Sequence, residues 1–228
     1  MSNTLAANDH ADGHHDGHDA QPWYLAHHFD NLHIQNHAVK LGMWLFLATE
    51  VLLFAGLFLG YTVYRWLYHD AFKANSGALN LTLGTINTVV LLTSSLTVAL
   101  AYHYIKKDDR KTCATLLVVT ILCACAFLVI KYFEYAHKFH EGMLPGKWYT
   151  YEGITEPGSP IFYAVYFLAT GLHAFHVIVG MSVLGWVLVR VVKGKYGSVH
   201  NVPVELGALY WHLVDLVWIF LFPLLYLI

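Results

Sequence analysis

Five long apolar stretches dominate the pattern of this chain, and shorter polar segments separate them. A helix needs roughly 20 mostly apolar residues to cross a bilayer core about 30 Å thick. The stretches that meet this length cover residues 41–64, 78–105, 112–132, 160–189 and 206–228. They are continuous rather than alternating apolar with polar residues, so membrane β-strands are not expected. The pattern predicts an all-α polytopic membrane protein with five transmembrane helices.

The N-terminal segment differs from the rest of the chain because it is polar and rich in His and Asp. We expect residues 1–35 to form a disordered cytoplasmic tail and residues 36–228 to form the five-helix bundle. The histidines of the tail could bind a metal weakly. A solvated tail is the simpler interpretation, because this segment has no residues that could build a packed core.

Basic residues near the helix ends predict how the chain crosses the membrane. The loops after the second and fourth stretches hold seven Lys and Arg residues, and those after the first and third hold four. Cytoplasmic loops carry an excess of Lys and Arg. The pattern therefore predicts a cytoplasmic N-terminus and a C-terminus outside.

The amino-acid composition supports a membrane protein and excludes several other classes of protein. The chain is 57% hydrophobic and only 12% charged, where a soluble domain carries about 25% charged residues. Its mean hydropathy is +0.49, which excludes a soluble globular domain or a disordered chain. The net charge of −2 provides no basic field for nucleic acid. The three cysteines have no zinc-binding spacing.

Polar residues inside the apolar stretches are the candidate functional residues. Glu50 lies ten residues into the first stretch, where an acid costs about 2.5–3.5 kcal/mol on insertion scales. It is either a hydrogen-bonded packing acid or a proton-exchanging or lipid-anchoring site. His173 and His176 share one face of the fourth helix, and a histidine could bond to Glu50. His212 and Asp215 repeat the spacing and are expected to form a structural polar pair, or to face a neighbouring subunit.

The basic end of the fourth helix is a second candidate region. Arg190 and Lys195 could bind lipid phosphates, or they could be ordinary cytoplasmic anchors. We predict no catalytic residue, cofactor or metal site within this chain.

Four segments, taken in order, resemble the signature segments of cytochrome c oxidase subunit III, in the haem–copper oxidase superfamily. They are Lys40–Glu50 (KLGMWLFLATE), Ile86–Ser95 (INTVVLLTSS), Ala169–Gly180 (ATGLHAFHVIVG) and Tyr210–Phe220 (YWHLVDLVWIF). The resemblance covers about residues 36–228.

The resemblance implies a non-catalytic role in a terminal oxidase that reduces oxygen to water and pumps protons. Haem and copper would lie in subunits I and II, with subunit I as the main contact. This chain would stabilise subunit I, bind structural phospholipid and support proton uptake. Glu50 falls on the membrane acid of the family, with His173 and His176 in the facing helix. Phe46 and Arg190 fall on lipid-binding positions.

This chain departs from the mitochondrial form of the family, which has seven helices. The first pair is missing, and with it one wall of the lipid cleft. A small further subunit could complete that cleft, or the cleft could be open to bulk lipid or absent. The five-helix form points to a prokaryotic plasma (inner) membrane.

Other functions compete with this one. Subunit III of a quinol oxidase is similar, and an accessory subunit of nitric oxide reductase is a more distant relative. A stand-alone proton or metal transporter would use Glu50, His173 and His176 as a relay, but no inverted repeat supports it. A haem-bearing membrane anchor would need axial ligands on facing helices.

Overall fold

The computed structural model describes residues 25–26, 29 and 31–228. The tail histidines at positions 10, 14, 15 and 18 lie outside these residues. The chain divides into two units, residues 1–39 and residues 40–228. The account below concerns the second unit.

Five helices within the described residues are long and apolar enough to cross a membrane. They are α1 (Leu32–Leu67), α3 (Leu81–Lys106), α4 (Arg110–His140), α5 (Ser159–Val192) and α6 (Val202–Tyr226). Two short elements join them, α2 (His69–Gly77) and a 3₁₀ turn (Gly146–Trp148), and no strand occurs in this part of the chain. The prediction of an all-helical protein with five spans is confirmed.

Three boundaries differ most from the sequence prediction. Helix α1 begins at Leu32, nine residues before the predicted start at residue 41, so the last residues of the expected tail are helical. Helix α4 continues to His140, eight residues past the predicted end at residue 132. Its additional turns contain Glu134 and Lys138, which are buried and paired rather than solvated. The polar segment after α1 forms the short helix α2, which contacts α5 and α6. Hydropathy ended the third stretch too early because it treats every charged residue as exposed, whereas Lys131, Glu134 and Lys138 of α4 are buried.

Side-chain caps fix the starts of α3 and α4. The Asn80 side chain accepts a hydrogen bond from the Leu83 amide, and the Asp109 carboxylate accepts one from the Thr112 amide, each at 3.1 Å. These bonds satisfy amides that have no partner inside the helix. Hydrogen bonds from Thr112 lower the pKa of Asp109, so its carboxylate stays ionised at neutral pH.

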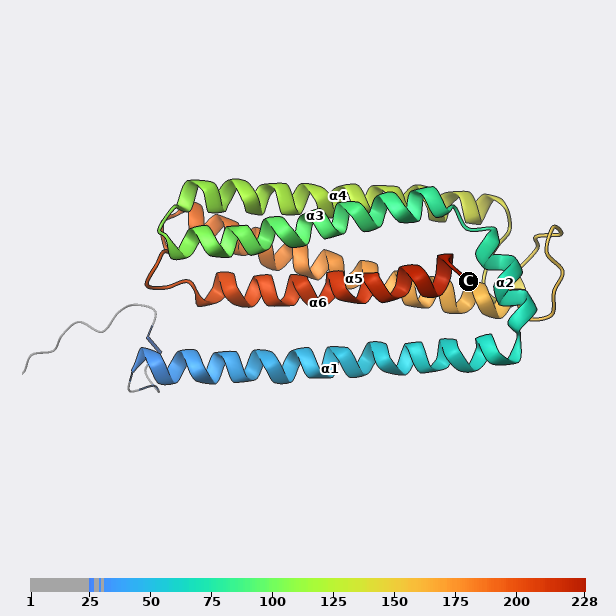
Figure 1. Ribbon diagram of the computed structural model, residues 1–228, viewed down its shortest axis with the longest axis horizontal. Helices are drawn as coiled ribbons and strands as arrows, with labels where there is room; N and C mark the ends of the chain where they lie inside the picture. Colours follow the sequence, from blue (N-terminus) through green and yellow to red (C-terminus); the bar gives the residue numbers. More distant parts are fainter. Residues whose placement is uncertain (1–24, 27–28, 30) are drawn as a thin grey trace, which may run out of the picture. The chain divides into compact units, whose positions relative to one another are not determined.

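Helices α3, α4, α5 and α6 form an antiparallel four-helix bundle (Figure 1). In this bundle α3 lies diagonally across from α5, and each of them contacts both α4 and α6. Two glycines let α6 approach its neighbours closely. A Cβ atom at Gly180 of α5 would lie 2.8 Å from the Trp211 ring, and one at Gly84 of α3 would lie 2.9 Å from the Phe222 ring. The bundle core is therefore built around large aromatic residues of α6.

Helix α1 meets the bundle through a narrow line of side chains. Its buried residues are Leu47, Phe54 and Tyr61, which recur every seven residues and so share one face. Phe58 packs on Phe220, and the Tyr61 hydroxyl donates to the Leu224 carbonyl. Most of the other large apolar side chains of α1 are exposed. In a membrane this surface faces lipid or another subunit.

Candidate functional site

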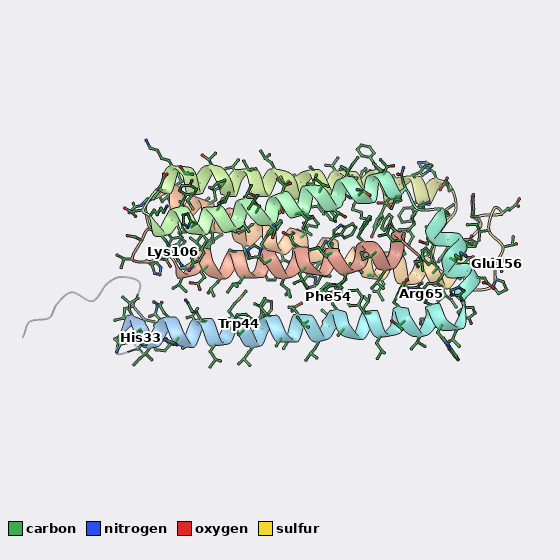
Figure 2. The ribbon with its side chains drawn as sticks, in the orientation of Figure 1. His33, Trp44, Phe54, Arg65, Lys106 and Glu156 are labelled. Carbon is green, nitrogen blue, oxygen red and sulfur yellow. The ribbon has the colours of Figure 1, made fainter. Side chains whose placement is uncertain are left out.

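The membrane acid Glu50 pairs with His176 between α1 and α5. Glu50 Oε2 lies 2.8 Å from His176 Nε2. Phe54, one turn further along α1 (Figure 2), packs edge-on against the His176 ring at 5.1 Å between centroids. Both members of the pair are largely buried, with side-chain exposures of 16% and 9%. The pair is thus a polar contact inside an apolar interface.

The bonds of His176 restrict where its protons can be. His176 Nδ1 lies 2.8 Å from the Leu172 carbonyl, which only accepts hydrogen bonds, so Nδ1 carries a proton. One further proton placed between Nε2 and Glu50 completes the pair. With that proton on the carboxyl both groups are neutral, and with it on the ring they form an ion pair. The site can therefore hold and transfer a proton without changing its geometry.

His173 does not reach Glu50, although the sequence made both histidines candidate partners. It is fully buried inside the bundle, between Phe127 of α4 and Trp218 of α6. Three residues rotate a helix by about 300°, so positions i and i+3 diverge by roughly 60°. That difference directs His176 to α1 and His173 into the bundle.

The predicted lipid-binding residues lie apart from one another. Phe46 of α1 stacks on Tyr210 of α6 at 6.0 Å. Arg190 lies in the last turn of α5 and packs over the Trp186 ring at 5.0 Å. Lys195 follows in the α5–α6 loop and is exposed. Phe46 thus lies on α1, whereas the two basic residues lie at the end of α5 and in the loop that follows it.

His212 and Asp215 share a face of α6 but do not form the expected polar pair. His212 Nδ1 instead lies 2.8 Å from the Ser95 hydroxyl of α3. Asp215 is buried, and neither of its carboxyl oxygens has a hydrogen-bond partner among the described residues. Both side chains lie beside Ser95 of α3 and have no hydrogen bond to each other among the described residues.

An apolar groove of about 600 Å³ lies between α1 and α6. Nine residues line it: Trp44, Leu47, Ala48, Val51, Leu52, Leu209, His212, Leu213 and Leu216. Its walls are almost entirely apolar, with His212 as the polar exception. Such a surface is suited to a hydrocarbon chain.

A buried ionic cluster on α4 escaped the sequence analysis. Lys131 Nζ lies 3.0 Å from Glu134 Oε2 and donates to the Tyr226 hydroxyl at 2.7 Å. The Tyr166 and Tyr226 hydroxyls both donate to Glu134 Oε1. Lys131 also lies 4.7 Å from the centre of the Trp218 ring. The cluster joins α4, α5 and α6 through fully bonded charges.

The signal for this cluster was present in the sequence. Lys131 and Glu134 are spaced i, i+3, which places opposite charges on one helix face. The two aromatic partners could not be found from spacing, because Tyr166 and Tyr226 are far along the chain. In the part of the chain that the structure describes, no three His, Cys, Asp or Glu side chains gather where they could hold a metal ion.

The family model described as cytochrome c oxidase subunit III matches residues 23–228. This range includes every transmembrane helix, the Glu50–His176 pair and the ionic cluster.

Curated relatives include proteins named cytochrome c oxidase subunit 3 from animals. The chain is 30% identical to the one from Loxodonta africana over 202 residues, covering 83% of this chain and 69% of the relative. It is 31% identical to the one from Oncorhynchus clarkii over 201 residues, covering 82% and 69%. It is 30% identical to the one from Petromyzon marinus over 216 residues, covering 89% of this chain and 73% of the relative.

Proposed function

The chain belongs to the cytochrome c oxidase subunit III family and is a multi-pass membrane subunit of an oxidase, and from this premise we propose that it is the non-catalytic third subunit of a proton-pumping terminal oxidase. Haem and copper are held by subunits I and II, and oxygen is reduced there. The match over residues 23–228 is the observation that carries the proposal.

Three tasks follow for this chain in the assembled enzyme. It stabilises subunit I, binds structural phospholipid and supports proton uptake. The exposed apolar surface of α1 supports contact with subunit I or with a small further subunit. The apolar groove between α1 and α6 supports a lipid chain there, and Arg190 and Lys195 supply the positive charges for a headgroup.

The proposed setting is a prokaryotic plasma membrane. The N-terminus is cytoplasmic and the C-terminus lies outside, as the distribution of Lys and Arg indicates. In this orientation Arg190 and Lys195 meet the inner leaflet, where anionic headgroups attract basic residues.

Purification through a tag on this chain tests the assignment. In a gentle detergent, we expect larger subunits with haem absorption bands to copurify with it. Adding reduced cytochrome c or a quinol then identifies the electron donor and separates the cytochrome c oxidase from the quinol oxidase. A colourless chain that purifies alone and conducts protons in liposomes would instead establish the transporter alternative.

Substitutions at Glu50 test the role of the membrane acid. Glu50→Gln retains a hydrogen bond to His176, so we expect normal assembly. Glu50→Ala leaves the buried imidazole without its partner, which costs about 1–3 kcal/mol. The measurements are the yield of haem-containing complex and the time for which oxygen consumption continues during turnover.

Thr49→Ala is the matched control, because Thr49 is exposed and its hydroxyl bonds only to the Phe46 carbonyl of its own helix. If Glu50→Ala behaves like Thr49→Ala in both measurements, the pair is a packing contact without a role in the oxidase. If Glu50→Gln assembles normally but loses sustained turnover, the carboxyl proton itself is needed.

A further inference from the structure

Three buried side chains in the α3–α6 bundle have no hydrogen-bond partner for any of their polar atoms. They are Asn87 on α3, His173 on α5 and Asp215 on α6. Their residue exposures are 0%, 0% and 3%. Buried polar groups in native proteins nearly always have a partner, either in the protein or in ordered water. Ser94 and Ser95 of α3 lie beside the Asp215 carboxyl, so Asn87 and His173 are the two residues that most need an explanation.

The contacts of Trp218 show that Asn87 and His173 lie at one level of the bundle. The Trp218 ring packs against the His173 ring at 5.2 Å. Its indole nitrogen donates at 3.1 Å to the hydroxyl of Thr88, the residue next to Asn87. Asn87 and His173 therefore lie at a similar level of the bundle, on the diagonal helices α3 and α5. Asp215 lies about one turn away on α6.

The chemistry of these groups is that of a water site. An Asn amide offers two donors and an acceptor, and a neutral imidazole offers one donor and one acceptor. A water molecule can bond to both, since it donates twice and accepts twice. Ordered water inside proteins typically makes two to four such bonds to groups that would otherwise be unsatisfied.

The ionic cluster lies next to this level of the bundle. Lys131 is 4.7 Å from the centre of the same Trp218 ring that packs against His173. Glu134 also lines a pocket of about 450 Å³ between residues 78–83, residues 133–143 and Tyr151. The ionic cluster thus lies between this pocket and the Trp218 ring that packs against His173.

We propose that ordered water occupies the centre of the α3–α6 bundle, bonded to Asn87 and His173 and reaching Asp215. The water continues the Lys131–Glu134 cluster and makes the bundle interior a hydrated site inside the membrane. Bilayer lipid is kept out by the four surrounding helices, so this site satisfies polar groups that the hydrocarbon could not.

Substitution of Asn87 by leucine, which has a similar volume, gives opposite results for a hydrated and a dry interior. In a hydrated site the change removes the amide that holds the water, so the bridge to His173 is lost and the imidazole is left unsatisfied. The unfolding midpoint of the purified complex then falls by about 4 °C or more. In a dry interior it removes two unpaired polar atoms, and the midpoint rises. Thr93→Val is the matched control on α3, because Thr93 is exposed and bonds only to the Val89 carbonyl.

A density map of the unmodified complex, at a resolution that shows ordered water, provides a second test that needs no variant. We expect density within hydrogen-bond distance of Asn87 and of His173. An empty interior, or a direct bond between the two side chains, would overturn the proposal. This map decides the question even if Asn87→Leu does not assemble.

Discussion

Lys131→Met is expected to lower the free energy of unfolding by about 3–5 kcal/mol. Lys131 and Glu134 are 4% and 3% exposed, so neither charge is solvated. Removing the ammonium leaves the Glu134 carboxylate buried with only the Tyr166 and Tyr226 hydroxyls as partners. The measurement is the denaturant midpoint of the complex, together with the amount of this chain in the membrane.

Removing both charges separates the ion pair from simple packing. Lys131→Met combined with Glu134→Leu should recover much of the lost stability, because no uncompensated charge remains. Lys111→Met is the control at an exposed position near the start of the same helix. If the double variant is as unstable as Lys131→Met, the loss comes from packing around the two tyrosines instead.

Gly180→Ala is expected to destabilise the α5–α6 contact by about 1–3 kcal/mol through overpacking. The added Cβ would lie 2.8 Å from Trp211 Cε3 and 3.2 Å from Tyr210 Cε1. Trp211 is fully buried, and its indole nitrogen donates to the Ser94 hydroxyl at 3.0 Å. The ring therefore cannot move aside without losing that bond. A lower unfolding midpoint is the expected result.

Gly185→Ala provides the control on the same helix. Nothing lies within 4 Å of a Cβ built at Gly185, so this change should be neutral or should stabilise by up to about 1 kcal/mol through helix propensity. Equal losses for the two variants would show that the effect comes from helix flexibility and not from Trp211.

The five membrane helices could be predicted from sequence because their signal is local. Each apolar run is long enough to cross a bilayer, and no partner is needed to recognise it. The end of α4 could not be predicted in this way. Lys131 and Glu134 interrupt the hydropathy, yet Tyr166 and Tyr226 make their burial possible from distant parts of the chain.

The candidate site was predictable in its residue types and less so in its geometry. An acid at mid-membrane needs a partner, and the sequence supplied two histidines one turn apart. Only the rotation of α5 relative to α1 determines that His176 is the partner. For His212 the partner is Ser95 on α3, and no spacing rule within α6 could reveal it.

The ionic cluster also constrains the order in which this protein can be made. Lys131 lies on α4, and its partners Tyr166 and Tyr226 lie on α5 and α6, which are synthesised after α4. Before α5 and α6 are made, the Lys131–Glu134 pair of α4 lacks its tyrosine partners, and placing these charges in the bilayer core would cost free energy. We therefore expect α4 to stay within the insertion machinery, or beside water, until α5 and α6 can enter the bilayer with it.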